Sequence, residues 1–391
     1  MNNFIFENNT KVIFGKGCVK EYLPCLLKCN CAADTVLLAY GGGAIKSNGI
    51  YEEIREALEK SGKQIVEFSG IMSNPTYQKV QEGARFIRES GAELILAVGG
   101  GSVIDCCKAV SLAASYEGDI WENFWARPGV IDFPLVPLIA VVTAAGTGSE
   151  MNGGAVITNE ALNLKTGRDY PQCNPRVSLL DPVYTYSVPK RQMVSGGFDT
   201  LSHLMETYFS APDEPNVSDD IMEALMRGVI RDLRAALKNP KDYNARSNLM
   251  WEAAMAENRI IKLGKKCDFE CHQMEHQLGA YTNCNHGEGL AVLHPVYYRH
   301  ICESGAEKFA RFAVQIWQID PEGKTEKELA YAGVELLADF IKELGLPTTL
   351  RELGIDESTD LRAIAESCTC VPNAYQVMTH EEILGIFQEV Y

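Results

Sequence analysis

Histidine is scarce in this chain, yet several histidines gather in one short stretch. Three of the seven histidines in the 391-residue sequence lie in CHQMEHQLGAYTNCNH, which runs from Cys271 to His286. His272 and His276 are four residues apart, the spacing that puts two side chains on one face of a helix. Imidazole nitrogens are common ligands of Zn²⁺ and Fe²⁺, and imidazole also transfers protons near neutral pH. The stretch therefore predicts a metal site, a proton-transfer site or both.

A second pair has the same spacing. Asp199 and His203 lie four apart on a predicted helix, in FDTLSHLMETY. One carboxylate and three neutral imidazoles suit a divalent ion and leave a coordination position for a substrate oxygen. An Asp–His pair on a helix is more often structural, however. Spacing alone does not decide which three of the five histidines between His272 and His300 would be ligands.

Two neighbouring side chains have simpler interpretations. Glu206 lies on the same side of the helix as Asp199 and is interpreted as a surface charge or as a partner of a metal ligand. His294 precedes a proline and is interpreted as a histidine of the core. Cys267, Cys271 and Cys284 lie close to the histidine stretch, where they would act either as competing ligands or, as we favour, as buried free thiols.

Glycine-rich turns follow several apolar runs in the first half of the chain. In AVGGGSVIDCCKA a predicted strand is followed by three glycines and then by a predicted helix. Glycines let backbone N–H groups approach an anion closely, and a helix N-terminus favours negative charge. We therefore expect this turn to hold a pyrophosphate. The turn matches neither the GxGxxG nor the P-loop pattern, and a purely structural tight turn has the same composition.

Another turn is expected to lie beside the adenosine ribose of a dinucleotide. In such sites an acidic residue binds the 2′-hydroxyl and repels a 2′-phosphate. Here Gly41, Gly42 and Gly43 follow the predicted strand, with Lys46 close behind and no carboxylate in the turn. This favours NADP(H) over NAD(H), unless Lys46 is simply a solvated lysine. A further turn, TAAGTGSEMN (143–152), is rich in small and hydroxyl-bearing residues.

The predicted secondary structure that positions these residues differs between the two halves of the chain. Up to about residue 188, short apolar runs alternate with amphipathic helices, which predicts βαβ units and a parallel sheet with helices on both faces. The remainder reads mostly as helices. We therefore expect an α/β dinucleotide-binding domain over residues 1–188. An all-α domain that binds metal and substrate is expected over residues 189–391.

Composition narrows the class of protein. The formal net charge is −16, which disfavours nonspecific binding to nucleic acid or anionic membranes. No apolar run is long enough for a transmembrane helix, and the N-terminus does not resemble a signal peptide. The 13 cysteines are odd in number and include no CxxC pair. This pattern indicates free thiols in a reducing cytoplasm rather than a disulfide framework.

Taken together and in order, these segments resemble the group III metal-dependent (iron-containing) alcohol dehydrogenases, most closely their butanol dehydrogenase-like branch. The resemblance covers essentially the whole chain. It rests on YGGGAIKSNG, SNPT, AVGGGSVIDCCKA, TAAGTGSEMN, LLDPVYTYSVP, GGFDTLSHLMETY and HQMEHQLGAYTNCNHGEGLA. It implies a dehydroquinate synthase-like fold, a homodimer, a nicotinamide cofactor and a divalent metal, with Fe²⁺ favoured and Zn²⁺ as the alternative.

The resemblance also assigns residues to roles. The implied metal ligands are Asp199, His203, His272 and His286, and His276 becomes a proton relay beside the metal. The implied cofactor-binding residues are Gly41, Gly42, Gly43, Asn74, Pro75, Gly99, Gly100, Gly101, Ser102, Asp105, Thr143, Thr147, Ser149, Asn152, Lys165 and Leu180. The chain departs from the branch at Ala44 and Ser47, which replace a Ser and a second Lys. Two potential phosphate contacts are thereby lost, which weakens the argument for NADP(H).

The implied reaction is reversible hydride transfer between NAD(P)(H) and primary alcohols or aldehydes, such as butanol and butanal. One alternative is an enzyme similar to glycerol dehydrogenase or dehydroquinate synthase that acts on polar substrates. Such substrates need a basic pocket, and the nearest candidate segment is IIKLGKK (260–266). The other alternative is a non-catalytic protein that binds a metal or a nucleotide, for which no aldehyde would support cofactor turnover.

Overall fold

The computed structural model describes residues 2–29, 33–211, 214–372 and 374–391, which form two compact units. The α/β unit consists of Glu7–Pro189 and Pro240–Asn258. The helical unit consists of the residues up to Phe6, Lys190–Asn239 and Arg259–Tyr391. Among the described residues, no helix has the length and apolar character needed to cross a membrane.

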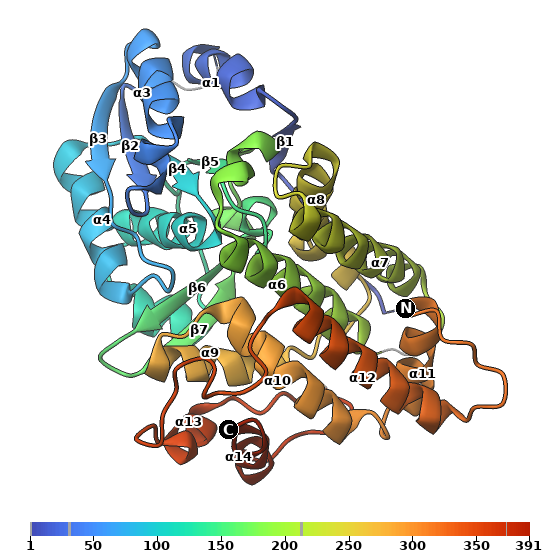
Figure 1. Cartoon of the computed structure of the whole chain (residues 1–391). Coiled ribbons are helices and arrows are strands. Elements are labelled where there is room, and N and C mark those ends of the chain that lie inside the picture. The colour runs from blue at the N-terminus through green and yellow to red at the C-terminus, as the bar shows by residue number, and fades with distance from the viewer. Residues whose placement is uncertain (1, 30–32, 212–213, 373) are drawn as a thin grey trace. The chain divides into compact units, whose positions relative to one another are not determined.

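A parallel sheet forms the centre of the α/β unit (Figure 1). Its strand order is β1-β8-β5-β4-β2-β3, and every neighbouring pair is parallel. The strands are β1 (Lys11–Phe14), β2 (Thr35–Tyr40), β3 (Gln64–Phe68), β4 (Leu94–Gly99), β5 (Leu138–Val142) and β8 (Val177–Leu180). β2 and β4 are apolar and almost wholly buried, as strands covered on both faces must be. The predicted parallel sheet is confirmed.

Helices cover both faces of this sheet. α1 (Cys18–Cys29) and α3 (Ile50–Lys60) pack on the face that includes Val36 and Leu38 of β2. α4 (Tyr77–Ser90) and α5 (Gly101–Ser115) pack on the opposite face, which includes Leu37 and Ala39. The alternation along β2 follows from the two-residue period of a strand, which sends successive side chains to opposite faces.

Short elements connect the strands and helices of this unit. They are α2 (Ala44–Ser47), the π-helical turn η1 (Trp121–Trp125), the 3₁₀ turns η2 (Ser149–Met151), η3 (Pro171–Cys173) and η4 (Pro182–Ser187), and an antiparallel hairpin of β6 (Gly154–Asn159) and β7 (Leu164–Asp169). The turns predicted to bind the dinucleotide follow β2, β4 and β5. The carboxyl ends of parallel strands share one edge of a sheet, where ligands of such folds bind.

The helix α8 (Tyr243–Glu257) belongs to the α/β unit, whereas the sequence analysis placed residues 240–258 in the helical domain. Met250 and Ala254 of α8 are buried in the same core as α4 and α5. Arg246 is also buried and donates hydrogen bonds to the hydroxyl and carbonyl oxygens of Thr185. Helical periodicity predicts a helix here but does not reveal which core its apolar face joins.

The helical unit is built around a buried helix, α6 (Lys190–Tyr208), which contacts α7 (Val217–Lys238) and α10 (His286–Ile301). α10 also packs against α9 (Glu270–Thr282). The remaining elements are η5 (Ile260–Lys262), α11 (Ala306–Gln315), α12 (Glu326–Leu344), α13 (Leu361–Ser367) and α14 (His380–Glu389). The predicted helical second half is therefore confirmed.

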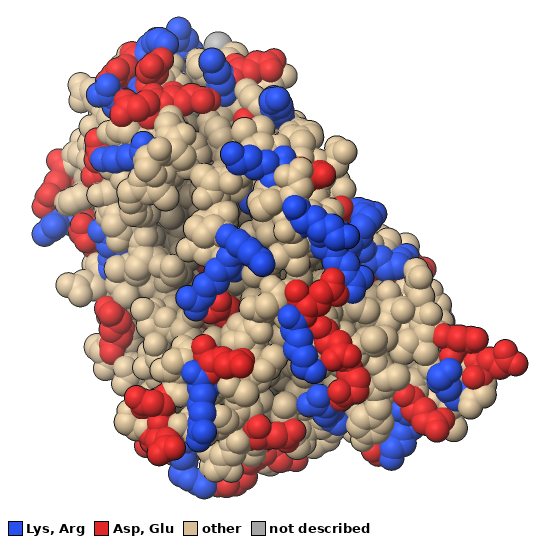
Figure 2. Space-filling view, viewed as in Figure 1, with Lys and Arg blue, Asp and Glu red and all other residues tan. Residues whose placement is uncertain are grey.

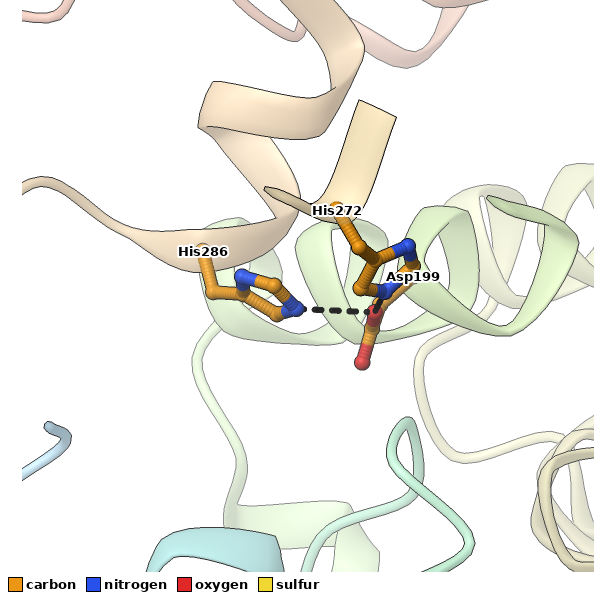
Figure 3. Close-up of side chains that lie close together, drawn as sticks. All are labelled: Asp199, His272 and His286. Atoms are coloured by element: carbon orange, nitrogen blue, oxygen red, sulfur yellow. Dashed lines mark ion pairs between the residues drawn. The ribbon is translucent and has the colours of Figure 1, made fainter. Parts of the chain in front are cut away.

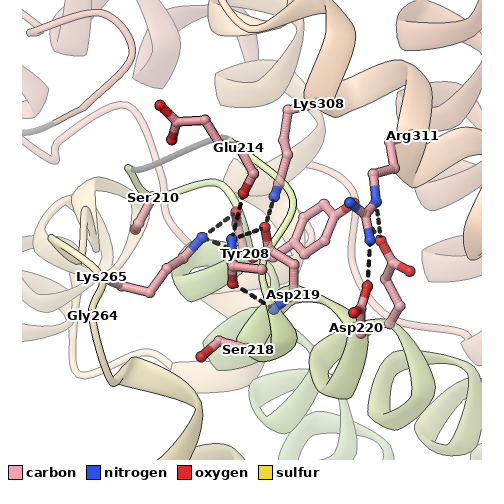
Figure 4. Close-up of polar contacts among 12 residues, drawn as sticks. Tyr208, Ser210, Glu214, Ser218, Asp219, Asp220, Gly264, Lys265, Lys308 and Arg311 are labelled. Carbon is pink, nitrogen blue, oxygen red and sulfur yellow. Dashed lines mark hydrogen bonds and ion pairs between the residues drawn. The ribbon is translucent and has the colours of Figure 1, made fainter. Parts of the chain in front are cut away.

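A buried ionic cluster fixes the start of α7 (Figure 4). The carboxylate of Asp219 is fully buried and accepts hydrogen bonds from the ammonium groups of Lys265, at 2.8 Å, and Lys308. Asn216 caps the helix by accepting from the backbone N–H of Asp219 at 3.0 Å. One carboxylate thus compensates two buried lysines from different segments, so it ties those segments to α7.

The surface agrees with the composition. On the face drawn in Figure 2, acidic and basic side chains are interspersed. Exposed ion pairs between helices of the described chain include Arg234 with Glu343 and Arg299 with Glu335. Exposed pairs of this kind contribute about 0–1 kcal/mol each, so they contribute to solubility more than to the fold.

Candidate functional site

Three of the predicted metal ligands meet in the helical unit (Figure 3). Asp199 comes from α6, His272 from the first turn of α9 and His286 from the first residue of α10. The Nε2 atoms of His272 and His286 lie 3.7 Å and 3.4 Å from the same oxygen, Oδ1 of Asp199. The potential ligand atoms of these three residues all lie within 4.8 Å of one another.

The fourth predicted ligand lies next to this group. His203 is one turn after Asp199 on α6, and its Nδ1 atom is 3.7 Å from Asp199 Oδ1. Its ring stacks on the ring of His272 with centroids 4.6 Å apart. His203 is therefore close to the carboxylate but outside the group of three whose ligand atoms all lie within 4.8 Å.

The donor set fits a divalent metal ion. Within the described part of the chain, Asp199 Oδ1 and His272 Nε2 are buried without a hydrogen-bond partner. Such atoms are costly to bury unless another group satisfies them. Ligand atoms at about 2.1 Å from a tetrahedral ion are about 3.4 Å apart. The observed separations of 3.4–3.7 Å are therefore close to those that a bound ion requires.

Two buried glutamates hold the histidines in this orientation. Glu206 Oε2 is hydrogen-bonded to Nδ1 of His272, and Glu275 Oε2 to Nδ1 of His286. A proton on Nδ1 leaves the lone pair on Nε2, which is the atom that faces Asp199. Glu206 also accepts from the backbone N–H of Cys271 at 2.8 Å. Of the two interpretations offered for Glu206, the surface charge is wrong, because its side chain is buried against a candidate ligand.

Glu275 was not identified from the sequence. It lies three residues after His272 on α9 but reaches His286 on the next helix, so no local spacing reveals the pairing. The only signal in the sequence was an acidic residue inside a histidine-rich segment.

The carboxylates and imidazoles of the cluster shift one another's pKa values. Burial alone would raise the pKa of Asp199, but His203 and His286 hold it well below its usual range. Burial likewise opposes ionisation of Glu206, and His272 lowers its pKa in spite of that. Burial disfavours the charged form of His272, yet Glu206 and Asp199 raise its pKa to about 10. Asp199 and Glu206 thus favour a positive charge at this position, which protonated His272 carries in the absence of an ion and which a bound divalent cation would supply.

His276 lies beside the candidate ligands. It is buried one turn after His272, and its ring centroid is 5.9 Å from that of His272 and 5.7 Å from that of His286. His276, Glu275 and His286 form a second close group of potential ligand atoms. The direct hydrogen bond between Glu275 and His286 leaves no room for an ion between those two atoms. His276 is therefore adjacent to the first group, as a proton relay would have to be.

Other candidate ligands have different roles. His294 is fully buried, its Nε2 atom is 2.7 Å from the Ser202 hydroxyl, and burial lowers its pKa to about 4, so it is a neutral core histidine. Cys271 and Cys284 are buried, and neither is in a disulfide bond with another described residue. Burial raises the pKa of Cys271 well above its usual value. No cysteine enters either close group of potential ligand atoms found among the described residues.

The turn predicted to hold a pyrophosphate, called the pyrophosphate turn below, lies between β4 and α5. β4 ends at Gly99, Gly100 is the N-cap of α5, and Gly101 is the first residue of the helix. A Cβ atom on Gly101 would lie 2.1 Å from the hydroxyl oxygen of Thr147, so only glycine fits. The backbone N–H groups at this helix start are available to an anion, and the turn packs directly against the loop that carries Thr147.

A buried polar network joins the two turns. Lys108 of α5 donates to the Ser149 hydroxyl at 2.7 Å, to Oδ1 of Asn152 at 3.0 Å and to the Gly154 carbonyl at 2.7 Å. Asp105, one turn earlier, accepts from the Ser149 hydroxyl at 2.5 Å. Ser149 and Asn152, predicted to line the nicotinamide side, use these polar groups inside the protein to hold the loop. Lys108 was missed in the sequence because a lysine within a helix normally faces solvent.

Most of the remaining predicted cofactor residues lie around the same sheet edge. The backbone N–H of Thr143 donates to the Gly99 carbonyl at 3.0 Å, and Leu180 is the buried last residue of β8. Gly41 follows β2, and its carbonyl accepts from Gly70 at 2.9 Å. Asn74 and Pro75 lie in the segment after β3, where the neighbouring Ser73 carbonyl accepts a hydrogen bond from the Ser102 hydroxyl. The Pro75 carbonyl accepts from Thr158 of the β6–β7 hairpin at 2.9 Å, and Lys165 is buried in β7 of that hairpin.

Comparison with known proteins gives a consistent result. The family model "Iron-containing alcohol dehydrogenase" matches residues 9–182, and the model "Fe-containing alcohol dehydrogenase family, C-terminal" matches residues 193–391. The NADH-dependent butanol dehydrogenase A of Clostridium acetobutylicum is 36% identical, over 100% of both chains. The NADPH-dependent aldehyde reductase YqhD of Escherichia coli is 33% identical, over 92% of this chain and 91% of that protein.

A solved structure shares the fold over the same length. The crystal structure of NADH-dependent butanol dehydrogenase A from Thermotoga maritima superimposes with a TM-score of 0.93. It is 35% identical in sequence, and the match covers 100% of this chain and 99% of that chain.

Proposed function

Because the chain belongs to the iron-containing alcohol dehydrogenase family and is an NAD(P)-dependent alcohol dehydrogenase, we propose that it holds a divalent metal at Asp199, His203, His272 and His286. Fe²⁺ is the favoured ion and Zn²⁺ the alternative. The observation that carries this proposal is the convergence of two glutamate-oriented imidazoles on one buried carboxylate oxygen.

The protein's own residues prepare this site. When bound, the ion supplies Lewis-acid polarisation of a substrate oxygen. Glu206 and Glu275 keep the Nδ1 protons of His272 and His286 in place, so that both Nε2 lone pairs face inward. Their burial keeps bulk water away from these hydrogen bonds and strengthens them.

His276 is proposed as the group that exchanges the proton of the substrate hydroxyl. In aldehyde reduction its imidazole gives up a proton to the product oxygen, and in alcohol oxidation it accepts one. Its burial and its position within 6 Å of two candidate ligand rings support this role.

The nicotinamide cofactor is proposed to bind the α/β unit through its pyrophosphate. The backbone N–H groups from Gly100 to Ser102 bind the anion, and the contact of Gly101 with Thr147 keeps the turn in position. The sequence favoured NADP(H) over NAD(H) because of Lys46, and that preference stays a prediction. Lys46, however, lies 3.6 Å from a carboxylate oxygen of Glu67, which weakens the reason for it.

Small primary alcohols and aldehydes, such as butanol and butanal, are the proposed substrates, because relatives are named for butanol and for aldehydes. The polar-substrate alternative required a basic pocket around residues 260–266. There, Lys265 is paired with Asp219, and Lys262 lies 4.5 Å above the ring of Phe269. The third lysine of the segment, Lys266, is exposed. Lys262 and Lys265 are therefore not arranged as a phosphate clamp. We further propose a cytoplasmic homodimer, in which a second copy would cover exposed apolar side chains such as Ile5.

The proposal is tested by replacing ligands one at a time. His272→Ala should lose most of its iron or zinc, measured by elemental analysis, and should lose aldehyde reduction in parallel. His300→Ala is the matched control, because that histidine is exposed and pairs only with Glu389 among the described residues. Full turnover by a metal-free His272→Ala protein would rule out the proposed role of the metal.

A further inference from the structure

A carboxylate lies at the end of β2 that is expected to face the adenosine ribose. It belongs to Glu67 on the edge strand β3, which is paired with β2 so that Glu67 is opposite Leu38. The Tyr40 hydroxyl donates to one carboxylate oxygen of Glu67 and the Tyr51 hydroxyl to the other, each at 2.5 Å. The carboxylate is thus fixed by two phenols although its side chain is 45% exposed.

The same carboxylate engages the lysine that would otherwise attract a phosphate. Lys46 Nζ lies 3.6 Å from Glu67 Oε2, 4.5 Å from the ring centroid of Tyr51 and 5.2 Å from that of Tyr40. The positive charge of Lys46 is therefore already compensated by a carboxylate and two aromatic faces. The two tyrosine hydroxyls also lower the pKa of Glu67, so it is ionised at neutral pH.

The location follows from the sheet. β2 is the direct neighbour of β4, with Tyr40 opposite Val98, and β4 leads into the pyrophosphate turn at Gly99. In doubly wound dinucleotide sites the adenosine ribose lies at the end of the strand next to the pyrophosphate strand. The segment after β3 also lies beside the turn after β2, because the backbone N–H of Ile71 donates to the Tyr40 carbonyl at 3.4 Å. Glu67 thus supplies from β3 the carboxylate that the turn itself lacks.

We propose that Glu67 determines cofactor specificity, making the site select NAD(H) against NADP(H) while it holds Lys46 away from a 2′-phosphate. This inference rests on the proposed function. A 2′-phosphate carries close to two negative charges, and it would meet an ionised carboxylate whose lysine partner is already engaged. NAD(H) has a neutral 2′-hydroxyl, which does not incur this repulsion. This proposal is therefore the opposite of the preference for NADP(H) expected from Lys46.

The test compares Glu67→Gln with wild-type protein for both cofactors. Glu67→Gln keeps the hydrogen-bonding shape but removes the charge. It should raise kcat/KM for NADPH about tenfold, as expected when one like charge near a phosphate is removed, and change that for NADH less than about twofold. Glu53→Gln is the matched control, since Glu53 also accepts from a tyrosine hydroxyl, that of Tyr184 at 2.8 Å. It should leave the cofactor ratio unchanged.

A double-mutant cycle with Lys46→Met tests the second half of the proposal. In the wild-type background, Lys46→Met should change NADPH use less than about twofold, because Glu67 already compensates the lysine. In the Glu67→Gln background, it should remove most of the gain in NADPH use. If Glu67→Gln folds poorly by circular dichroism, Glu67→Ser provides the same loss of charge.

Binding of adenosine fragments separates this inference from the proposed function. Calorimetry with 5′-AMP and 2′,5′-ADP reports 2′-phosphate discrimination even if no aldehyde is turned over, and Glu67→Gln should narrow the affinity gap between the two. An unchanged gap, an equal change for both fragments, or a wild-type protein that prefers NADPH would overturn the role of Glu67. Absent turnover with a normal fragment gap would instead overturn the proposed reaction alone.

Discussion

The orientation of the candidate metal ligands depends on two residues that do not themselves face Asp199. His272 and His286 each donate an Nδ1 proton to a buried glutamate, Glu206 in one case and Glu275 in the other. Without these partners, each ring would be able to rotate or to adopt the other tautomer, which would turn Nε2 away from the ion. Metal affinity should therefore depend on both glutamates as well as on the ligands.

Glu206→Gln and Glu275→Gln should each weaken metal binding about 10–100-fold, the usual cost of losing a partner of a ligating histidine. The measurement is competition for Zn²⁺ against a chelator of known affinity. Glu335→Gln is the control, because Glu335 forms only an exposed pair with Arg299 among the described residues. Unchanged affinity in both glutamate variants would contradict an orienting role.

The sequence predicted the ligand residues better than their partners. The i, i+4 spacings identified candidate functional residues, because residues at that spacing share a helix face. These residues are Asp199, His203, His272 and His276. His286 stood out as part of the same histidine-rich stretch, whereas the roles of the individual residues required the family resemblance. Glu275 could not be found, because its partner is on another helix and the pairing depends on how α9 packs against α10.

At the scale of elements, hydrogen bonds hold the α5 helix and the loop after β5 together. Lys108 and Asp105 of α5 bond to the loop, and Glu150 is buried beside them. Burial raises the pKa of Glu150 to about 7, against the opposing effect of Lys108. A carboxyl whose pKa is raised on folding stabilises the fold only while it remains protonated.

Glu150→Gln should therefore stabilise the protein at alkaline pH more than at acidic pH. From its ordinary value of 4.5 to about 7, folded Glu150 retains a proton that the unfolded chain releases, so wild-type stability falls across this interval. Glutamine does not titrate, and its advantage should approach about 3 kcal/mol above pH 7 and vanish below pH 4.5. Thermal unfolding at pH 5 and pH 8 checks this; an equal shift in Tm at both values would contradict it.

The buried cluster at the start of α7 gives a prediction about stability alone. Asp219→Asn would leave Lys265 and Lys308 buried without a carboxylate, which should cost about 3–5 kcal/mol. The adjacent Asp220→Asn removes only the partly exposed pair with Arg311 and should cost about 0–1 kcal/mol. Denaturant unfolding compares the two. Similar costs would show that the ionic cluster does not hold these segments together.

Helices and strands were predictable from the sequence where the pattern of apolar residues agrees with their burial in the structure. Apolar runs such as those of β2 and β4 alternate with amphipathic helices, and together they predict a parallel sheet with two covered faces. The position of α8 was not predictable, because its apolar residues would suit either core. The position of Glu67 beside the turn after β2 was not predictable either, because it depends on the order of the strands in the sheet.

At the scale of the whole molecule, the proposed metal site and the proposed dinucleotide site belong to different units. Every candidate metal ligand lies in the helical unit, and every glycine turn proposed for the dinucleotide lies in the α/β unit. Removing the metal should therefore leave the dinucleotide turns intact. Chelated protein is expected to bind NADH with an affinity within about twofold of that of untreated protein, because none of the proposed metal ligands belongs to the unit proposed to hold the cofactor.

The most direct test of the account is an anaerobic assay of butanal reduction on one metal-analysed preparation, before chelation, after it and after return of Fe²⁺ or Zn²⁺. NADH and NADPH are compared side by side at each stage. The account predicts turnover that disappears with the metal, returns with it and is faster with NADH. Turnover that persists in fully chelated protein would contradict the central claim that Asp199 and its histidines hold a metal required for the reaction.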